Sequence, residues 1–524
     1  MKYKVLITTS GIGQRLGEIT KYTNKALVRV GKKPSLAYII ESYPIDTSFI
    51  ITIGYFANHI KEFISLAYPD RDIKFVEIDN YNGKGSSLGY SMLQAKKLLQ
   101  CPFIYHASDT IVTEKIPEAK ENWIGVFKGK DASQYASWKK INGKTLIFND
   151  KGALDFDYIH IGLVGINDYK KYWETLEKLY KKNLSNNTLN DCQVIVSMLS
   201  DGDKFNLVSF KQWIDTGNVA ALQHAREQIA DKFNNLDKLE ESIFLFNDFV
   251  IKFFHDKKII QDRVKRGKFL KGLVPDIEGA TENFYRYKYT KGDLYANVAT
   301  PSNFNDFLIW TNKNLWTKVN GINPKLFKRK CHEFYFDKTK KRIQQFLESN
   351  KIKDRENIIN GEKTPSIEKI LQKVDFEWLA DAEPYRFHGD FILDNILKTK
   401  NGYCLIDWRH NFGGLLEAGD IYYDLSKLNH NLTVNHDIIH KNLFSIKIEK
   451  DGKINCDILR KNNLVECQKL LFDFLKKEGY NTKKVNVLTG LIWLNMSPLH
   501  HYPFNLFLYY FGKLHLWRAI GENK

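Results

Sequence analysis

One stretch constrains this chain more than any other, because it sets two carboxylates and an amide at fixed spacing. Asp390 and Asn395 lie five positions apart in residues 388–397, and Asp407 follows an apolar run in residues 403–408. Phosphoryl transfer needs a carboxylate beside the attacking hydroxyl and two oxygen ligands for the Mg²⁺ on ATP. The spacing therefore predicts that Asp390 faces the hydroxyl while Asn395 and Asp407 bind the metal.

The same residues resemble the aminoglycoside phosphotransferase and choline kinase family. Its His-Gly-Asp, Asn and Ile-Asp-Trp elements are matched at 388–390, 395 and 406–408, and residues 419–425 are similar to its structural segment after the metal-binding Asp. The resemblance implies an α+β protein-kinase-like phosphotransferase domain that uses ATP and Mg²⁺. The alternative is a buried His, a turn Asp and a strand Asp that fall in this order without forming a site.

At the other end of the chain, residues 5–17 read as a strand that runs into a glycine loop containing Ser10, Gly11 and Gly13. Such loops turn backbone N–H groups toward phosphate oxygens, and glycine lets the ligand approach the main chain. The third glycine comes one residue too late for a dinucleotide fold, and no Gly-Lys-Ser or Gly-Lys-Thr is present. The loop predicts nucleotide binding, with a plain turn as the alternative.

Together with residues 20–28 and 31–34, this loop resembles the signature of the sugar-phosphate nucleotidylyltransferases. The resemblance implies that Arg15 and Lys25 neutralise the triphosphate and the attacking phosphate, and it makes Lys151 a candidate second lysine on the substrate phosphate. The chain departs from the family pattern at residues 8–10 and at Asn24, where proline is usual.

Two more segments extend this resemblance. Residues 83–91 correspond to the family's second nucleotide-contacting loop and place Gly85 and Ser86 against the nucleotide. Asp109 ends a strand-like run, and Asp215 lies in a Trp-x-Asp-Thr-Gly segment. The resemblance implies that these two aspartates bind the Mg²⁺ that bridges the nucleotide phosphates, whereas a lone strand-end Asp is more often a helix cap.

The alternation of strands and helices in the first part of the chain predicts a parallel α/β sheet with its ligand at the strand ends. We predict a Rossmann-like nucleotidyltransferase domain over 1–235 and a kinase-like phosphotransferase domain over 236–524. The small lobe of the kinase-like domain would span about 240–295, and its large lobe about 296–524. A hairpin over 243–254 makes Lys252 a candidate for binding ATP phosphates. No glycine loop precedes Lys252 and the next helix holds no Glu, so an exposed strand lysine is the alternative.

The composition of the chain limits the classes of binding partner. Lysine and arginine exceed aspartate and glutamate by 78 − 61 = 17, yet the basic residues are scattered, so a solvated surface is favoured over a nucleic-acid footprint. Six cysteines without zinc spacing favour reduced thiols in a cytoplasmic protein. No apolar run approaches the roughly 20 residues of a membrane helix, and the oligomeric state is open.

The leading hypothesis is a bifunctional enzyme. The C-terminal domain would phosphorylate a small hydroxyl compound, expected to be a sugar, with ATP, and the N-terminal domain would couple the product to a nucleotide from CTP or UTP. The activated product would serve capsule or lipopolysaccharide synthesis. One alternative makes the substrate choline or another amino alcohol and the product a CDP derivative. An alternative from another class is a catalytically dead nucleotide- or nucleic-acid-binding protein.

Overall fold

The computed structural model describes residues 3–141, 145–229 and 238–521, and these form two compact units. The first unit comprises Met1–Ile260 and Glu278–Tyr287; the second comprises Gln261–Ile277 and Lys288–Lys524. The predicted boundary at residue 235 lies outside the described residues. The predicted small lobe of about 240–295 is shared between the two units, and the domain limits stay a prediction.

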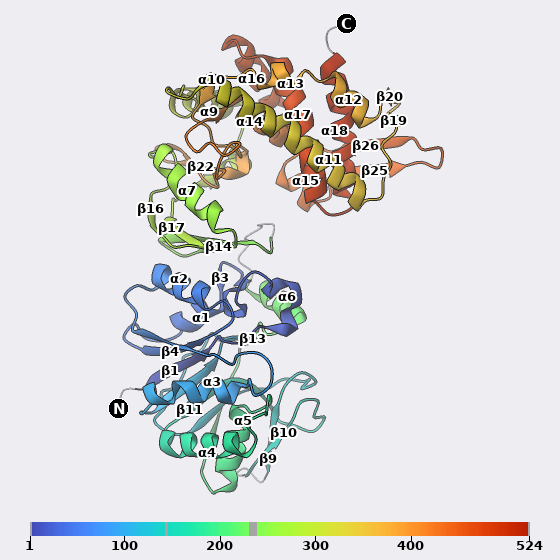
Figure 1. Ribbon diagram of the computed structural model, residues 1–524. Coiled ribbons are helices and arrows are strands. Elements are labelled where there is room, and N and C mark those ends of the chain that lie inside the picture. The colour runs from blue at the N-terminus through green and yellow to red at the C-terminus, as the bar shows by residue number, and fades with distance from the viewer. Residues whose placement is uncertain (1–2, 142–144, 230–237, 522–524) are drawn as a thin grey trace. The chain divides into compact units, whose positions relative to one another are not determined.

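The first unit is built on a mixed sheet whose parallel centre is apolar on both faces (Figure 1). The central strands β6, β1, β4 and β5 lie side by side in that order and run parallel. Val5, Leu6 and Ile7 of β1 are fully buried, as expected for a strand covered on both sides. The strands of this sheet are β1 (Lys4–Thr8), β4 (Ser48–Ile53), β5 (Ile73–Glu77), β6 (Phe103–Ala107), β8 (Trp123–Phe127), β9 (Ser137–Ile141), β10 (Thr145–Asn149), β11 (Tyr158–Ile166) and β12 (Asn206–Phe210).

Helices connect these strands, and two short ladders lie beside the sheet. The helices of the first unit are α1 (Ser35–Glu41), α2 (Ala57–Ala67), α3 (Leu88–Ala95), α4 (Tyr169–Lys182), α5 (Asp191–Ser200) and α6 (Val219–Gln228). The short ladders are β2 (Arg29–Val30) with β3 (Lys33–Pro34), and β7 (Thr110–Val112) with β13 (Trp213–Asp215). The predicted α/β alternation is therefore found in this unit.

A second sheet covers helix α2 of the first unit. Its strands, in the order β14-β15-β17-β16, are β14 (Glu241–Leu245), β15 (Phe249–Phe254), β16 (Ile277–Ala280) and β17 (Phe284–Lys288). Phe253 of β15 is 1% exposed, and its ring centroid lies 5.0 Å from that of His59 on α2. Its side chain shares one apolar core with β1, α1 and α2. Figure 1 shows α1 and α2 between the two sheets.

Polar contacts fasten the same sheet to α2. The Glu62 carboxylate accepts hydrogen bonds of 2.8 Å from the Thr281 hydroxyl and from the Asn283 backbone N–H. The Arg286 guanidinium donates to the Leu66 carbonyl at 2.8 Å. These contacts join the β16–β17 turn and β17 to α2, while β14 and β15 share the apolar core, so strands β14, β15 and β17 are part of the first unit's structure.

The second unit is mostly helical, with small sheets at its edges. Its helices are α7 (Lys257–Phe269, which begins in the first unit), α8 (Tyr295–Val298), α9 (Pro301–Asn314), α10 (Pro324–His332), α11 (Lys338–Ser349), α12 (Ile367–Lys373), α13 (Phe376–Ala380), α14 (Ile421–Thr433), α15 (His436–His440), α16 (Asn462–Lys477), α17 (Thr482–Met496) and α18 (Phe504–Gly521). Its strands are β18 (Asp293–Leu294), β19 (Asn357–Ile359), β20 (Glu362–Thr364), β21 (Pro384–Tyr385), β22 (Ile396–Thr399), β23 (Gly402–Leu405), β24 (Gly419–Asp420), β25 (Phe444–Ile448) and β26 (Ile454–Ile458).

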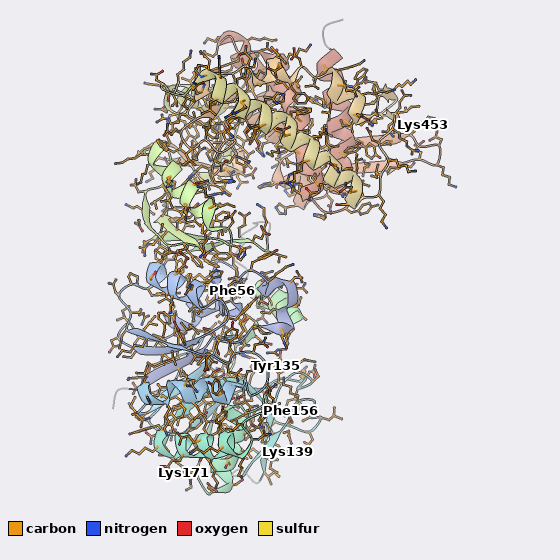
Figure 2. All side chains as sticks on the ribbon, in the orientation of Figure 1. Phe56, Tyr135, Lys139, Phe156, Lys171 and Lys453 are labelled. Atoms are coloured by element: carbon orange, nitrogen blue, oxygen red, sulfur yellow. The ribbon has the colours of Figure 1, made fainter. Side chains whose placement is uncertain are left out.

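Helices α17 and α18 form the centre of the second unit, and α14 and α11 pack on α17. Both central helices bury residues on all sides, which is the pattern of a helix enclosed by others. A Cβ at Gly490 would lie 3.1 Å from the Leu516 Cα, so the two helices approach closely there because glycine has no side chain. In Figure 2, Lys453 marks the loop between β25 and β26, away from this core.

Two further observations concern the cysteines and the expected lack of a membrane helix. The six cysteines are free thiols. Among the described residues, we find no helix whose length and apolar content would let it cross a membrane.

The packing of β15 on α2 predicts a long-range effect of one core substitution. Phe253→Ala removes a buried ring and should destabilise the first unit by about 3–5 kcal/mol. Hydrogen exchange followed by mass spectrometry should then show faster exchange in β1 and β4 as well as in β15. The control is Leu154→Ala, since Leu154 is fully exposed. Faster exchange confined to β14–β17 would show that this sheet does not share the core.

Candidate functional site

Backbone pairing brings the two predicted metal aspartates of the first unit together. Asp109 lies in the turn between β6 and β7, and Asp215 ends β13, which pairs antiparallel with β7. The Thr216 N–H donates to the Asp109 carbonyl oxygen at 2.9 Å. A Cβ placed on Gly217 would lie 3.1 Å from Asp109 Oδ2 and 3.0 Å from Asp215 Oδ1. The two carboxylates therefore converge on one point.

The predicted basic residues face the same point. Lys25 Nζ lies 3.3 Å from Asp109 Oδ2, and Arg15 Nη2 lies 3.8 Å from the same oxygen. Arg15 is half exposed, so it can reach a ligand in solvent. Burial would raise the pKa of Asp109, but the charges of Lys25 and Arg15 outweigh it and hold that pKa below its usual range.

The second carboxylate has the opposite shift. Burial and the charge of Asp109 raise the pKa of Asp215, although the Gly217 N–H and the Tyr135 hydroxyl donate to it. Two carboxylates whose oxygens converge repel each other when both are ionised. Mg²⁺ prefers oxygen ligands and relieves this repulsion, so such a pair suits a divalent cation. Asp109 and Asp215 therefore fit the predicted Mg²⁺.

Tyr135 and Asn24 contribute in ways that the sequence did not indicate. The Tyr135 hydroxyl, on the loop before β9, donates to Asp215 Oδ2 at 2.8 Å, and no spacing links these residues (Figure 2). Asn24 donates to the carbonyl oxygens of Thr9 and Tyr55 at 2.8 and 2.6 Å, and its side-chain oxygen accepts from the Ala26 N–H. Asn24 thus fixes the loop that carries Lys25 by hydrogen bonds.

The first predicted glycine loop lies beside these residues. Gly13 has a φ of +71°, and a Cβ there would lie 3.1 Å from the Lys25 Cβ. Gly11 has open space around it. Ser10 is buried, and its hydroxyl pairs with that of Ser91 at 3.0 Å. Gly11 thus leaves room for a ligand, while Ser10 is engaged with α3.

Three other predicted residues are not brought into this group by any observed contact. The Gly85 N–H donates to Asn187 Oδ1 at 2.6 Å, and the Ser86 hydroxyl donates to the Gly83 carbonyl at 2.7 Å. Lys151 is exposed in the turn after β10. Their roles in binding nucleotide and substrate phosphate stay predictions.

A neighbouring cluster of His160, Asp191 and Cys192 has metal-ligand chemistry but a different explanation. His160 Nδ1 accepts from the Trp138 indole N–H at 3.2 Å, so Nε2 carries the proton and donates to Asp191 Oδ2 at 2.9 Å. Burial raises the pKa of the Cys192 thiol and keeps it protonated. The cluster is a hydrogen-bonded core element, because no histidine nitrogen is left for a metal.

In the second unit, the predicted catalytic loop forms around Asp390. Asn395 Nδ2 donates to the Asp390 carbonyl oxygen at 2.9 Å and to Asp390 Oδ2 at 3.1 Å. The Ile406 N–H donates to the Asn395 carbonyl at 2.8 Å across the β22–β23 hairpin. Asn395 and Asp407 therefore lie at the same end of this hairpin.

Asp424 holds the loop in place from α14. Its carboxylate accepts from the backbone N–H groups of His388 and Gly389 at 2.7 and 2.6 Å, and from the Trp316 indole N–H at 3.3 Å. Burial raises the pKa of Asp424 to about 6, against the lowering effect of these donors. Gly389 has a φ of +87°, and a Cβ there would lie 2.6 Å from the Arg409 Cβ, so only glycine fits.

Two cations that pair with the predicted site carboxylates Asp390 and Asp407 were not predicted. Lys427 Nζ lies 2.8 Å from Asp390 Oδ1. Arg263 pairs with Asp407, which has a φ of +57°. Lys427 lies three residues after Asp424 in the helical run that follows residues 419–425, and this spacing is the one signal that could have pointed to it.

The predicted metal ligands of the second unit, Asn395 and Asp407, fit a bound cation only in part. The Asn395 amide nitrogen is used on Asp390, so its oxygen remains to bind a cation, whereas a metal on Asp407 would compete with Arg263. Lys252 is buried on β15 in the first unit, and its role in binding ATP phosphates stays a prediction.

The comparisons with known proteins find structural neighbours over the N-terminal part of the chain. A CTP:phosphocholine cytidylyltransferase from Streptococcus pneumoniae shares 17% identity at a TM-score of 0.36, covering 44% of this chain and 100% of its own. A UDP-glucose pyrophosphorylase from Acinetobacter baumanii shares 18% at 0.36, covering 45% and 96%. An inositol-1-phosphate CTP transferase from T. maritima shares 15% at 0.35, covering 44% and 97%.

No family model and no curated protein sequence matches the chain. Identities and TM-scores this low do not establish a shared activity. The function therefore has to be inferred from the residues and their geometry.

The convergence at Gly217 predicts how the first site should respond to an added methyl group. In Gly217→Ala the Cβ would press on Asp109 and Asp215 at about 3 Å and move their oxygens. We expect affinity for Mn²⁺, measured by EPR with UTP, to fall about 10–100-fold, the usual effect of disturbing a ligand's support.

To assign the Mn²⁺ affinity to this site, the measurement is repeated with Asp109→Asn, which should lose the bound Mn²⁺. Gly521→Ala is the control, because a Cβ there meets nothing within 4 Å. Unchanged Mn²⁺ affinity in Gly217→Ala would mean that the carboxylates do not hold the metal at this point.

The Lys427–Asp390 contact predicts a pH effect in the second unit. Burial would raise the pKa of Asp390, but Lys427 lowers it to about 2, so the carboxylate is ionised at every pH above that value. In Lys427→Gln the burial effect is no longer opposed, and the pKa of Asp390 should rise. The acid limb of ATP-dependent activity, followed by ADP release, should then move to higher pH.

Lys477→Gln, at an exposed lysine on α16, should leave the profile unchanged. If the acid limb of Lys427→Gln coincides with that of the unmodified protein, Lys427 does not control the ionisation of Asp390.

Proposed function

We propose that the chain is a bifunctional enzyme that makes a nucleotide-activated small molecule in two consecutive steps. The second unit phosphorylates a hydroxyl of an acceptor with ATP, and the first unit joins the resulting phosphate to a nucleotide from CTP or UTP. The observation that carries the proposal is the convergence of Asp109, Asp215, Lys25 and Arg15. Two carboxylates with two cations provide the charges that nucleotidyl transfer requires.

In the first unit, Lys25 and Arg15 would neutralise anionic phosphates while Asp109 and Asp215 would hold Mg²⁺. The bound Mg²⁺ supplies charge neutralisation for the triphosphate. The acceptor phosphate oxygen attacks the α-phosphorus of the NTP, the new P–O–P bond forms, and the bond to the β-phosphate breaks to release pyrophosphate. No covalent enzyme intermediate is needed, so alignment and charge are the residues' main contribution.

In the second unit, Asp390 would orient the acceptor hydroxyl. The hydroxyl oxygen attacks the γ-phosphorus of ATP, the bond from γ-phosphorus to the β–γ bridging oxygen breaks, and ADP leaves. Because Lys427 holds the pKa of Asp390 at about 2, the carboxylate accepts the hydroxyl proton only as the new P–O bond forms and passes it to solvent. Asn395 and Asp407 would hold Mg²⁺ on the phosphates.

The two reactions should separate by mutation, because each proposed site uses its own carboxylates, Asp109 and Asp215 in the first unit and Asp390 in the second. Asp390→Asn keeps the shape of the side chain but removes the charge, so phosphorylation should fall about 10²–10⁴-fold. Asp109→Asn should stop nucleotide transfer and let the phosphorylated acceptor accumulate. Products are read by mass spectrometry after incubation with ATP, Mg²⁺, the four NTPs and a panel of hydroxyl compounds.

Mixing the two variants should restore the final product through the released intermediate. A single variant that remains folded yet loses both reactions would contradict the two-site proposal. If the unmodified chain forms no product but still binds nucleotides, the alternative of a protein that binds nucleotides without catalysis would be favoured.

A further inference from the structure

Four basic side chains interact electrostatically beside Asp390 of the predicted catalytic loop: Lys338 and Arg342 on α11, Arg409 after β23, and Lys427 on α14. We call them the cation cluster. The charges of Arg409, Lys427 and Arg342 all act on Lys338, and so does that of Asp390. Arg409 also acts on Arg342 and on Lys427. The four cations and Asp390 therefore form one electrostatic group.

The charges of this group do not cancel within the protein. Lys427 pairs with Asp390 at 2.8 Å, and it is the one member with a carboxylate partner among the described residues. Arg342 donates to the Gln345 side-chain oxygen at 3.2 Å, and Arg409 donates to the Asn411 carbonyl at 2.9 Å. Lys338, Arg342 and Arg409 thus have no carboxylate of the described residues within ion-pair distance.

One aromatic ring holds two of these cations in place. Lys338 Nζ lies 4.2 Å from the ring centroid of Phe334, and the Arg409 guanidinium carbon lies 5.1 Å from the same centroid. The Tyr423 ring stands at 90° to Phe334 with centroids 5.0 Å apart. The Phe334 ring is therefore already engaged by two of the protein's own positive charges.

Lys427 of the cation cluster contacts one oxygen of Asp390. Oδ1 contacts Lys427, whereas Oδ2 accepts from Asn395, a predicted metal ligand. The Asn395 side belongs to the metal and the ATP phosphates, so the Lys427 side is left for the acceptor. The side chain of Asp390 is 39% exposed, which leaves the loop accessible from solvent.

The cation cluster is electrostatically unfavourable unless an anion is bound to it. Lys338 and Arg342 lie four residues apart on α11, and like charges at that spacing destabilise a helix. Burial and the neighbouring cations lower the pKa of Lys338 well below its usual range. Proteins retain such unbalanced groups where a ligand supplies the missing charge.

We propose that the acceptor phosphorylated by the second unit carries an anionic group, a carboxylate or a phosphate, that binds the cation cluster while its hydroxyl faces Asp390. This inference rests on the phosphotransfer proposed above and names its substrate class: a hydroxy acid, a sugar acid or a sugar phosphate. Choline and amino alcohols are disfavoured, because a cationic acceptor would stand among like charges, and the Phe334 ring is already engaged by Lys338 and Arg409.

The test compares matched acceptors that differ in charge: glycerol, glycerate and glycerol phosphate; glucose, glucuronate and glucose 6-phosphate; and choline. Binding is measured by calorimetry and phosphorylation by ADP release, with Asp390→Asn as the blank. We expect each anionic compound to bind more tightly than its neutral counterpart. The comparison of glycerate with glycerol phosphate, and of glucuronate with glucose 6-phosphate, shows whether a carboxylate or a phosphate is preferred. Arg342→Gln and Lys338→Gln should weaken anion binding about 10–100-fold and leave the KM for ATP unchanged.

Lys341→Gln is the matched control, since Lys341 is an exposed lysine on the same helix. Lys338→Gln should also raise the melting temperature, because it removes an amine whose charged form burial and the neighbouring cations disfavour; a purely structural lysine would lower it. Anions that bind no better than their neutral counterparts, or binding unaffected by Arg342→Gln, would overturn the inference.

The two proposals can fail separately. If Asp390→Asn leaves all phosphorylation unchanged, the phosphotransfer proposal fails, while calorimetry still decides whether the cation cluster binds anions. If a neutral or cationic acceptor is phosphorylated best and depends on Asp390, phosphotransfer stands and the anionic acceptor is wrong.

Discussion

The arrangement of both candidate sites depends on one interaction, the pairing of a partly enclosed carboxylate with lysine or arginine. Asp109 is held by Lys25 and Arg15, and Asp390 by Lys427. Burial raises the pKa of both carboxyl groups, and in each case the nearby cations lower the pKa by more. The cations therefore maintain the negative charge that metal binding and hydroxyl orientation need.

Much of the first unit and the positions of the main acidic residues could be predicted from the sequence. Strand alternation predicted the parallel centre of the sheet, and the sequence spacing singled out Asp390 and Asn395, whose side chains the structure brings into contact, although their roles stay predictions. Local pattern is informative here because both features depend on nearby residues. The meeting of Asp109 with Asp215 followed from family resemblance, since no local spacing links residues so far apart.

Other features could not be predicted because they depend on tertiary packing. Tyr135 reaches Asp215, and Lys427 reaches Asp390, from elements with no sequence relation to their partners. The apolar alternation of β15 predicted a strand but not that it would cover α2 in the first unit's core. Periodicity shows which side of a strand is buried; it does not show what buries it.

The central claim is that one chain performs two consecutive phosphate transfers, and isotope tracing tests it most directly. The full chain is incubated with ATP labelled with ¹⁸O at the γ-phosphate, unlabelled CTP and UTP, Mg²⁺ and the acceptor panel. The account predicts a nucleotide-linked product whose pyrophosphate bridge joins a labelled phosphate from ATP to an unlabelled phosphate from CTP or UTP. A nucleotide-linked product without the label, or label found only in inorganic phosphate, would contradict it.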